Sequence, residues 1–268
     1  MTSSNPTQKR TETALVTGAS SGIGEAIARQ LAQERHNLVL VARNETRLRS
    51  LVEELSRQFA VRVDFLPVDL AAVDAARALA RNLEGAEIDV LVNNAGYGLH
   101  GEFVNSDEGK LIGMLQLNVV ALTQLTRQLL PGMLRRRHGR ILNVASTAGF
   151  QPGPLMAVYC ATKAYVLSFS EALYAELAGS GVSVTTLCPG ATRTGFDAAA
   201  NASKIRLFQS GGVMDAETVA RFAVRGLLHG RRLVIPGLAN RILAHTVGFM
   251  PRGLTLKVAR RSLSPARG

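Results

Sequence analysis

The chain has 268 residues, of which 47% are hydrophobic and 19% charged, a composition typical of a globular protein and not of a disordered one. Its formal net charge is +11, but residues 1–200 carry 19 basic and 18 acidic side chains, whereas residues 201–268 carry 12 basic and 2 acidic ones. Because the basic excess is confined to the last quarter of the chain, a nucleic-acid-binding protein is not expected.

Location and metal content can also be predicted from the sequence. The N-terminus is polar and no apolar run approaches roughly 18 residues, so neither a secretory signal nor a spanning helix is expected and we predict a cytoplasmic protein. Cys160 and Cys188 form no CxxC pair, and the five histidines form no HExxH motif. A disulfide scaffold and a metal site are therefore not expected.

Short apolar runs alternate with amphipathic segments along the chain. The runs are rich in Val, Leu and Ile, as strands buried on both faces are, and occupy residues 14–18, 37–42, 61–67, 89–96, 139–146, 182–190 and 231–237. Helices are expected over residues 23–35, 44–59, 71–84, 107–136, 157–178 and 216–228, with Asp215 as the N-cap of the last. This alternation predicts an α/β fold, a doubly wound parallel sheet of about seven strands in a single domain. Ligands of such sheets bind at the carboxyl ends of the strands.

The first predicted strand leads into a glycine-rich turn, TGASSGIG, at Thr17–Gly24. Gly18 permits a tight turn, Gly22 lets the backbone approach a phosphate, and Gly24 allows the helix to pack closely on the strand. The free amide groups and the positive dipole end of the helix would then hold a pyrophosphate. The turn predicts a dinucleotide site.

The second predicted strand ends at Ala42 without a carboxylate, and Arg43 follows it. An acidic residue at this place usually binds the ribose 2′-hydroxyl of NAD, whereas an arginine can pair with a 2′-phosphate. NADP(H) is therefore favoured, and NAD(H) is the alternative.

Three further residues are candidates for proton transfer and for hydrogen bonding to a substrate. Tyr159 and Lys163 are four residues apart, so they share one face of the predicted helix 157–178. An ammonium group beside a phenol favours the phenolate and is expected to lower the pKa of Tyr159. Ser146, at the end of the fifth predicted strand, can donate a hydrogen bond to a substrate oxygen.

The motifs TGASSGIG, NNAG (93–96), Ser146, YCATK (159–163) and Pro189–Gly190 occur in the order typical of one family. Over about residues 14–237 the chain resembles the short-chain dehydrogenase/reductase family. The resemblance implies a Rossmann-type fold and NAD(P)-dependent interconversion of a carbonyl and an alcohol. Its Asn-Ser-Tyr-Lys tetrad would be Asn118, Ser146, Tyr159 and Lys163.

The resemblance also implies the role of each residue. Tyr159 would be the catalytic acid/base, Lys163 would hold the nicotinamide ribose, and Asn118 would hold a relay water. The implied cofactor-binding residues are Gly18, Ser20, Ser21, Gly22, Ile23, Gly24, Arg43, Asp69, Leu70, Asn94, Ala95, Gly96, Tyr159, Lys163, Pro189, Gly190, Thr192 and Thr194. Asp69 could equally be a helix N-cap. Thr192 departs from the family pattern, in which an aliphatic residue is more usual.

The substrate is expected to contact the loops 97–105, 147–156 and 191–214, the last as a closing lid. They carry Tyr97, Leu99, Phe150, Leu155, Met156, Phe196, Ile205, Leu207, Phe208 and Met214, with His100 as a polar group. This mostly apolar set predicts a small hydrophobic ketone or alcohol. Two alternatives stay open: a reductase of 3-oxoacyl thioesters on a carrier, and a non-catalytic NADP-binding docking protein.

The chain is divided into a flexible N-terminus (1–11), a catalytic domain (12–238) and a basic C-terminal extension (239–268). In the extension Leu256, Ala259 and Leu263 recur at helical spacing, with Lys257, Arg260 and Arg261 away from them. Such a segment could hold the protein peripherally on an anionic membrane, bind an acidic carrier, or pack on the body or on a partner subunit. By family resemblance a homodimer or homotetramer is expected, formed through the helices after Asp107 and Tyr159.

Overall fold

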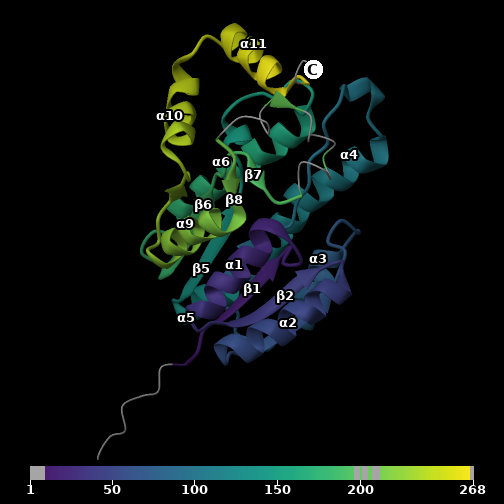
Figure 1. Ribbon diagram of the computed structural model, residues 1–268. Coiled ribbons are helices and arrows are strands. Elements are labelled where there is room, and N and C mark those ends of the chain that lie inside the picture. Colours follow the sequence, from purple (N-terminus) through teal and green to yellow (C-terminus); the bar gives the residue numbers. More distant parts are fainter. Residues whose placement is uncertain (1–9, 196–199, 201–204, 207–211, 266–268) are drawn as a thin grey trace, which may run out of the picture.

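The computed structural model describes residues 10–195, 200, 205–206 and 212–265 (Figure 1). Its main sheet has the order β3 (Val63–Pro67), β2 (Asn37–Ala42), β1 (Thr13–Thr17), β4 (Val90–Asn93), β5 (Gly139–Val144), β6 (Val182–Leu187) and β9 (Leu233–Val234). Every neighbouring pair is parallel. The chain moves outward from β1 to β3 and then crosses to β4, so the order reverses at β1, as in a doubly wound sheet. The predicted fold is confirmed.

Helices cover both faces of this sheet. One face packs against α1 (Gly22–Gln33), α2 (Glu45–Phe59) and α9 (Ala216–Leu228). The other packs against α3 (Ala75–Asn82), α5 (Leu122–Arg136) and α6 (Ala157–Glu176). Alternate residues of a strand serve the two cores: Val16 belongs to the first and Leu15 to the second. Because both faces are buried, the strands carry apolar residues almost without interruption.

Two predicted helices differ from the structure. The helix expected over 107–136 consists of α4 (Glu108–Leu115), a π-helical turn η2 (Gln116–Ala121) and α5. The helix expected from residue 71 begins only at Ala75, after Asp74. Asp69 is therefore not its N-cap, because the Asp69 carboxylate instead accepts a hydrogen bond from the amide of Ala71, 3.0 Å away.

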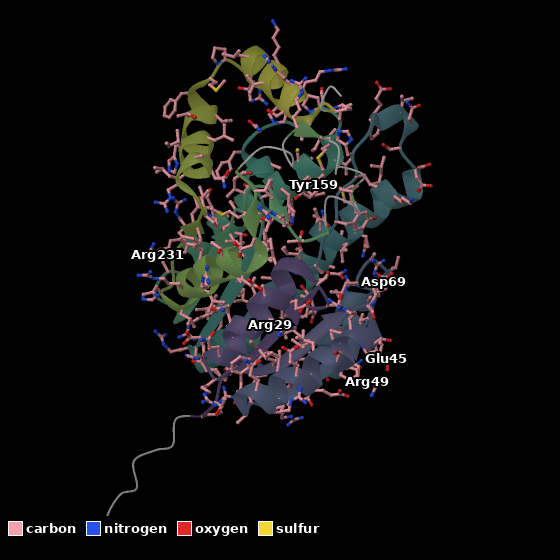
Figure 2. All side chains as sticks on the ribbon, viewed as in Figure 1. Arg29, Glu45, Arg49, Asp69, Tyr159 and Arg231 are labelled. Atoms are coloured by element: carbon pink, nitrogen blue, oxygen red, sulfur yellow. The ribbon has the colours of Figure 1, made fainter. Side chains whose placement is uncertain are left out.

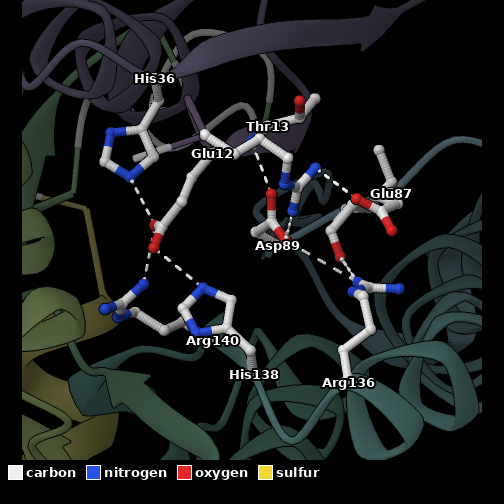
Figure 3. A network of polar contacts seen from close by, with 10 residues as sticks. Glu12, Thr13, His36, Glu87, Asp89, Arg136, His138 and Arg140 are labelled. Atoms are coloured by element: carbon white, nitrogen blue, oxygen red, sulfur yellow. Dashed lines mark hydrogen bonds and ion pairs between the residues drawn. The ribbon is translucent and has the colours of Figure 1, made fainter. Parts of the chain in front are cut away.

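A polar network ties the amino ends of the strands together, at the edge opposite their carboxyl ends (Figure 3). The Glu12 carboxylate lies 2.8 Å from Arg140, 2.9 Å from His138 and 3.2 Å from His36. Burial alone would raise the pKa of Glu12, but the hydrogen bond from Arg140 and the charges around it hold this pKa below its usual value. The buried Asp89 accepts hydrogen bonds from Arg10 and from the Thr13 amide. The network holds β1 in register with its neighbours.

The chain after β9 forms a C-terminal arch, residues 238–263. It consists of α10 (Leu238–Thr246), the turn η4 (Val247–Phe249) and α11 (Arg252–Leu263). Figure 1 shows the arch (yellow) at the end of the molecule away from α2. α11 packs onto the body through Thr255, Ala259 and Leu263. Within the described residues, no helix has the length and apolarity needed to cross a membrane.

Candidate active site

One cavity of about 710 Å³ lies at the carboxyl ends of the strands. Every predicted cofactor-binding residue lines it except Gly24, and so does Ser146. Gly24 instead lies behind the turn, where a Cβ would collide with the Gly18 carbonyl and the Asn94 amide. That position fits the packing role predicted for Gly24.

The glycine turn needs its glycines at two positions that face the cavity. Gly18 and Gly22 have φ angles of +66° and +59°, which residues other than glycine rarely adopt. A Cβ on Gly18 would lie 2.7 Å from Nδ2 of Asn94, and one on Gly22 would lie 2.8 Å from Cβ of Thr194. The conformation and the packing of the turn therefore both require glycine at these two positions, and both line the cavity.

The NNAG motif after β4 braces the same turn. Nδ2 of Asn94 donates hydrogen bonds to the carbonyls of Thr17 and Gly18, at 3.0 and 3.2 Å. The Thr17 hydroxyl accepts from the amides of Asn94 and Ala95 and donates to the carbonyl of Val92. Residues about 75 positions apart thus fix the shape of the turn, because these bonds join the end of β1 to the end of β4 and the residues after it.

The start of α1 fits a phosphate group. Ser21 is its N-cap residue, but no side chain caps the helix. The first amide groups of α1 thus remain available to a ligand, and the dipole of the helix favours an anion there. Arg43 is exposed at the cavity rim and has no ion-pair partner among the described residues. Glu45 pairs with Arg49 at 2.8 Å on the outside of α2 (Figure 2) and does not line the cavity.

Ser146 and Tyr159 meet at the other end of the cavity. Ser146 follows β5 and begins the short helix η3 (Thr147–Phe150), accepting a hydrogen bond at Oγ from the amide of Ala148. Tyr159 comes from the first turn of α6 and lies beneath the arch (Figure 2). Burial raises the pKa of the Tyr159 phenol above its usual value, although a hydrogen bond with Ser146 acts to lower it. The expected lowering of this pKa is wrong for the chain without a ligand, because burial dominates.

Lys163 lies one turn further along α6. Its Nζ donates to the Val144 carbonyl at 2.8 Å and lies 5.8 Å from the centre of the Tyr159 ring. Burial lowers the pKa of Lys163 to about 8. The ammonium group is thus near the phenol, but it is bound to the main chain of β5.

Asn118 lies in the π-helical turn η2 and is 1% exposed. It exchanges two hydrogen bonds with the backbone of Tyr97 and donates a third to the Thr162 hydroxyl. Asn118 does not line the cavity; Gly96 stands between it and Lys163. A Cβ on Gly96 would be 2.9 Å from Oδ1 of Asn118 and 3.6 Å from Nζ of Lys163.

The predicted substrate residues divide into four groups. Tyr97 and Met156 line the cavity, whereas Leu99 and Leu155 line a separate one of about 50 Å³. Ile205, Phe150 and Met214 belong to apolar clusters. Phe196, Leu207 and Phe208 lie outside the described residues. At the ends of the predicted lid, β7 (Thr192–Arg193) and β8 (Met214–Asp215) pair in parallel.

The substrate end of the cavity has a second wall that the motifs do not identify. It comes from the C-terminal arch: Leu243, Val258, Ala259, Ser262 and Leu263. Leu263 also packs with Met156 and Cys160, and its carbonyl lies 2.7 Å from Nε2 of His100. The helical spacing of Ala259 and Leu263 is visible in the sequence, but the partner of that face is not.

Comparisons with known proteins agree with this geometry. A family model described as short chain dehydrogenase matches residues 12–205. A short-chain dehydrogenase from Sphingobium yanoikuyae in complex with NADPH has a TM-score of 0.80 and 35% identity, over 91% of this chain and 94% of that one. The bulky-bulky ketone specific alcohol dehydrogenase from Comamonas testosteroni has a TM-score of 0.77 and 32% identity, over 90% and 94%.

Among curated sequences, ketoacyl reductase HetN from Nostoc sp. is 33% identical over 219 residues, which are 81% of this chain and 75% of that protein. The chain spans only about half the length of several other curated relatives, with matches over 53–58% of them.

Proposed function

This chain belongs to the short-chain dehydrogenase family of oxidoreductases, and we propose that it interconverts a hydrophobic ketone and a secondary alcohol with NADP(H). The observation that carries the proposal is the arrangement of one cavity. Its first end is the glycine turn at α1, and its second end holds Ser146, Tyr159 and Lys163. A dinucleotide along this cavity would bring its nicotinamide end to these three residues.

The residues present fit the cofactor. The amides at the start of α1 would hold the pyrophosphate, and Arg43 would pair with the 2′-phosphate. The NADPH complex of the Sphingobium yanoikuyae relative supports this choice of cofactor. When bound, the nicotinamide supplies or accepts the hydride.

The side chains would then handle the proton. The Ser146 hydroxyl would donate a hydrogen bond to the substrate oxygen, and the Tyr159 hydroxyl would protonate it during reduction. The Tyr159 phenol would carry this proton before the reaction, since burial raises its pKa above the usual value. Lys163 would hold the ribose and stabilise the phenolate left behind. Asn118 would hold a water beside Gly96 for the return of the proton.

Replacing Tyr159 tests the proposal. Tyr159→Phe keeps the ring but removes the proton donor, so kcat for ketone reduction should fall about 10²–10⁴-fold. NADPH binding, followed by fluorescence, should stay unchanged. Tyr174→Phe, a half-exposed residue of the same helix, is the matched control. Turnover retained in Tyr159→Phe would support the alternative of a non-catalytic NADP-binding protein.

The apolar wall of the cavity supports a bulky hydrophobic substrate. The ketone preference named for the Comamonas testosteroni relative is consistent with it. A 3-oxoacyl thioester is the second candidate, because ketoacyl reductase HetN is similar over 81% of this chain. A ketone panel beside a 3-oxoacyl thioester, followed by NADPH absorbance and repeated with NADH, separates the two.

We also propose a reducing, cytoplasmic setting, which two thiols support. Cys160 and Cys188 are both buried and free. Burial raises the pKa of each thiol, to about 11 and about 12, so neither is a reactive thiolate at neutral pH. Free buried cysteines of this kind are usual in proteins from reducing compartments.

A further inference from the structure

The C-terminal arch exposes large apolar side chains to solvent. Leu238 and Ile242 of α10 are 71% and 56% exposed, and Phe249 in the turn between the helices is 91% exposed. Leu254 at the start of α11 is 49% exposed. Exposed apolar side chains gathered on one element mark a surface that contacts something other than water.

The same arch is strongly basic. It carries Arg241, Arg252, Lys257, Arg260 and Arg261, and the chain has no acidic residue after Glu217. None of these five cations forms an ion pair with any described residue. Lys257 and Arg261 are one turn apart, on the side of α11 opposite the buried Ala259. The arch therefore exposes both large apolar side chains and cations that have no ion-pair partner among the described residues.

The arch is also part of the cavity wall. Leu243 of α10 and Val258 of α11 line the cavity and yet are 40% and 45% exposed. Both side chains are thus partly open to solvent where they border the cavity. The substrate end is therefore bordered by the same element that exposes Ile242 and Phe249.

We propose that the C-terminal arch docks on an anionic lipid surface and admits a lipophilic substrate between Leu243 and Val258. Apolar side chains at this surface enter the lipid interface while the cations meet anionic headgroups. A second copy of the chain fits less well, because a two-fold interface through the arch would bring together two basic surfaces that have no acidic residue of their own. The access route rests on the proposed oxidoreductase function, whereas docking does not.

Co-sedimentation with vesicles tests the docking. The full chain should pellet with vesicles of phosphatidylcholine mixed with phosphatidylserine, and not with phosphatidylcholine alone. The double variants Ile242→Ser/Phe249→Ser and Lys257→Glu/Arg261→Glu should each lower the partition coefficient about tenfold or more. None of the four side chains lines the cavity. An unchanged melting curve would show that the variants are folded.

Matched controls carry the same changes elsewhere on the surface. Phe103→Ser/Val104→Ser alters exposed apolar residues of η1 (Phe103–Asn105), and Arg57→Glu/Arg81→Glu alters exposed cations of α2 and α3. Both should bind vesicles as the unmodified chain does. The proposal is overturned if the unmodified chain does not pellet, or if arch and control variants pellet equally. It is also overturned if Ile242→Ser/Phe249→Ser instead dissociates an oligomer in sedimentation velocity.

Turnover measurements distinguish a failure of the docking proposal from a failure of the proposed oxidoreductase function. Reduction of a water-soluble ketone without vesicles should be the same in the arch variants and the unmodified chain. If the unmodified chain reduces this ketone but does not bind the vesicles, the docking alone is contradicted and the oxidoreductase function is not. For a lipophilic ketone dissolved in anionic vesicles, the arch variants should show a KM raised about tenfold, while kcat stays unchanged.

Discussion

Lys163 carries its ammonium group where a charge is costly. It is 6% exposed, and burial lowers its pKa from 10.5 to about 8. Between these two values the unfolded chain holds a proton that the folded chain releases, so the free energy of unfolding rises with pH. Below about pH 8 the folded protein keeps the buried charge and bears its full cost. The buried Lys163 ammonium group therefore lowers the stability of the folded protein at neutral pH.

Lys163→Met should therefore stabilise the protein at neutral pH while removing activity. Methionine has a similar length and no charge, so the free energy of unfolding at pH 7 should rise by about 1–3 kcal/mol. The gain should shrink as the pH approaches 10.5, where both states of the unmodified chain lose the proton. Urea unfolding at pH 7 and pH 10 measures it, with the exposed Lys110→Met as control. A variant less stable than the unmodified chain at pH 7 would contradict the argument.

Arg43 is predicted to decide between the two nicotinamide cofactors. A charge-assisted bond to a phosphate contributes about 1.5–3 kcal/mol, so Arg43→Leu should raise KM for NADPH about 10–100-fold. KM for NADH should change little, because NADH has no 2′-phosphate. Steady-state rates with both cofactors measure the change. Arg47→Leu, on the outside of α2 next to Glu25, is the control. Equal losses with both cofactors would show that Arg43 acts on the fold instead.

At the scale of elements, the strands are the most predictable part. Continuous runs of Val, Leu and Ile report burial on both faces, and all seven predicted strands are present. Helix ends depend on finer contacts. Amphipathic spacing continues from 107 to 136, but it cannot reveal the π turn at Asn118, because that turn depends on hydrogen bonds to Tyr97 and Thr162 from distant segments. The N-cap role considered for Asp69 failed for the same reason, since the helix begins only after Asp74.

The site was predictable where it depends on local chemistry. The glycine turn, Ser146, Tyr159 and Lys163 lie together as their spacing and place in the sheet predict. The cavity wall on the C-terminal arch was not predictable. The helical spacing of Ala259 and Leu263 indicates that one side of α11 is buried, but it does not indicate which part of the protein covers that side. The predicted direction of the Tyr159 pKa shift was wrong for a related reason. The burial that raises this pKa arises only when segments distant in the sequence pack around Tyr159.

The arch should set the size of the substrate. Ala259 is 1% exposed and lines the cavity, so Ala259→Phe would place a ring in the space proposed for the substrate. KM for a bulky ketone should rise about tenfold or more, whereas a small ketone and NADPH binding should be little affected. Leu256→Phe, half-exposed on the same helix and outside the cavity lining, is the control. An unchanged preference for bulky over small ketones would show that the substrate does not reach α11.

At the scale of the molecule, α6 has a face that none of the described residues covers. Its outward side exposes small residues at helical spacing, Ala161, Ala164, Ser168 and Ala172, beside Tyr165, which is 39% exposed. Tyr165 is held by stacking on Phe169 and by a hydrogen bond with Thr123 of α5. Small exposed residues let a second helix approach closely, so this face supports a two-fold dimer through α6.

Ala164→Arg tests the dimer that we propose through α6: it should separate the two subunits and leave each of them folded. The side chain points to solvent in one subunit, but in a two-fold interface two added guanidinium groups would face each other near the axis. Sedimentation velocity should show a shift from dimer to monomer mass, with an unchanged circular dichroism spectrum. Gln58→Arg, on the exposed side of α2, adds the same charge elsewhere and should keep the dimer. Because the active-site residues of α6 lie on its inner side, the monomer should still bind NADPH. A dimer that survives Ala164→Arg would exclude the α6 face as the interface.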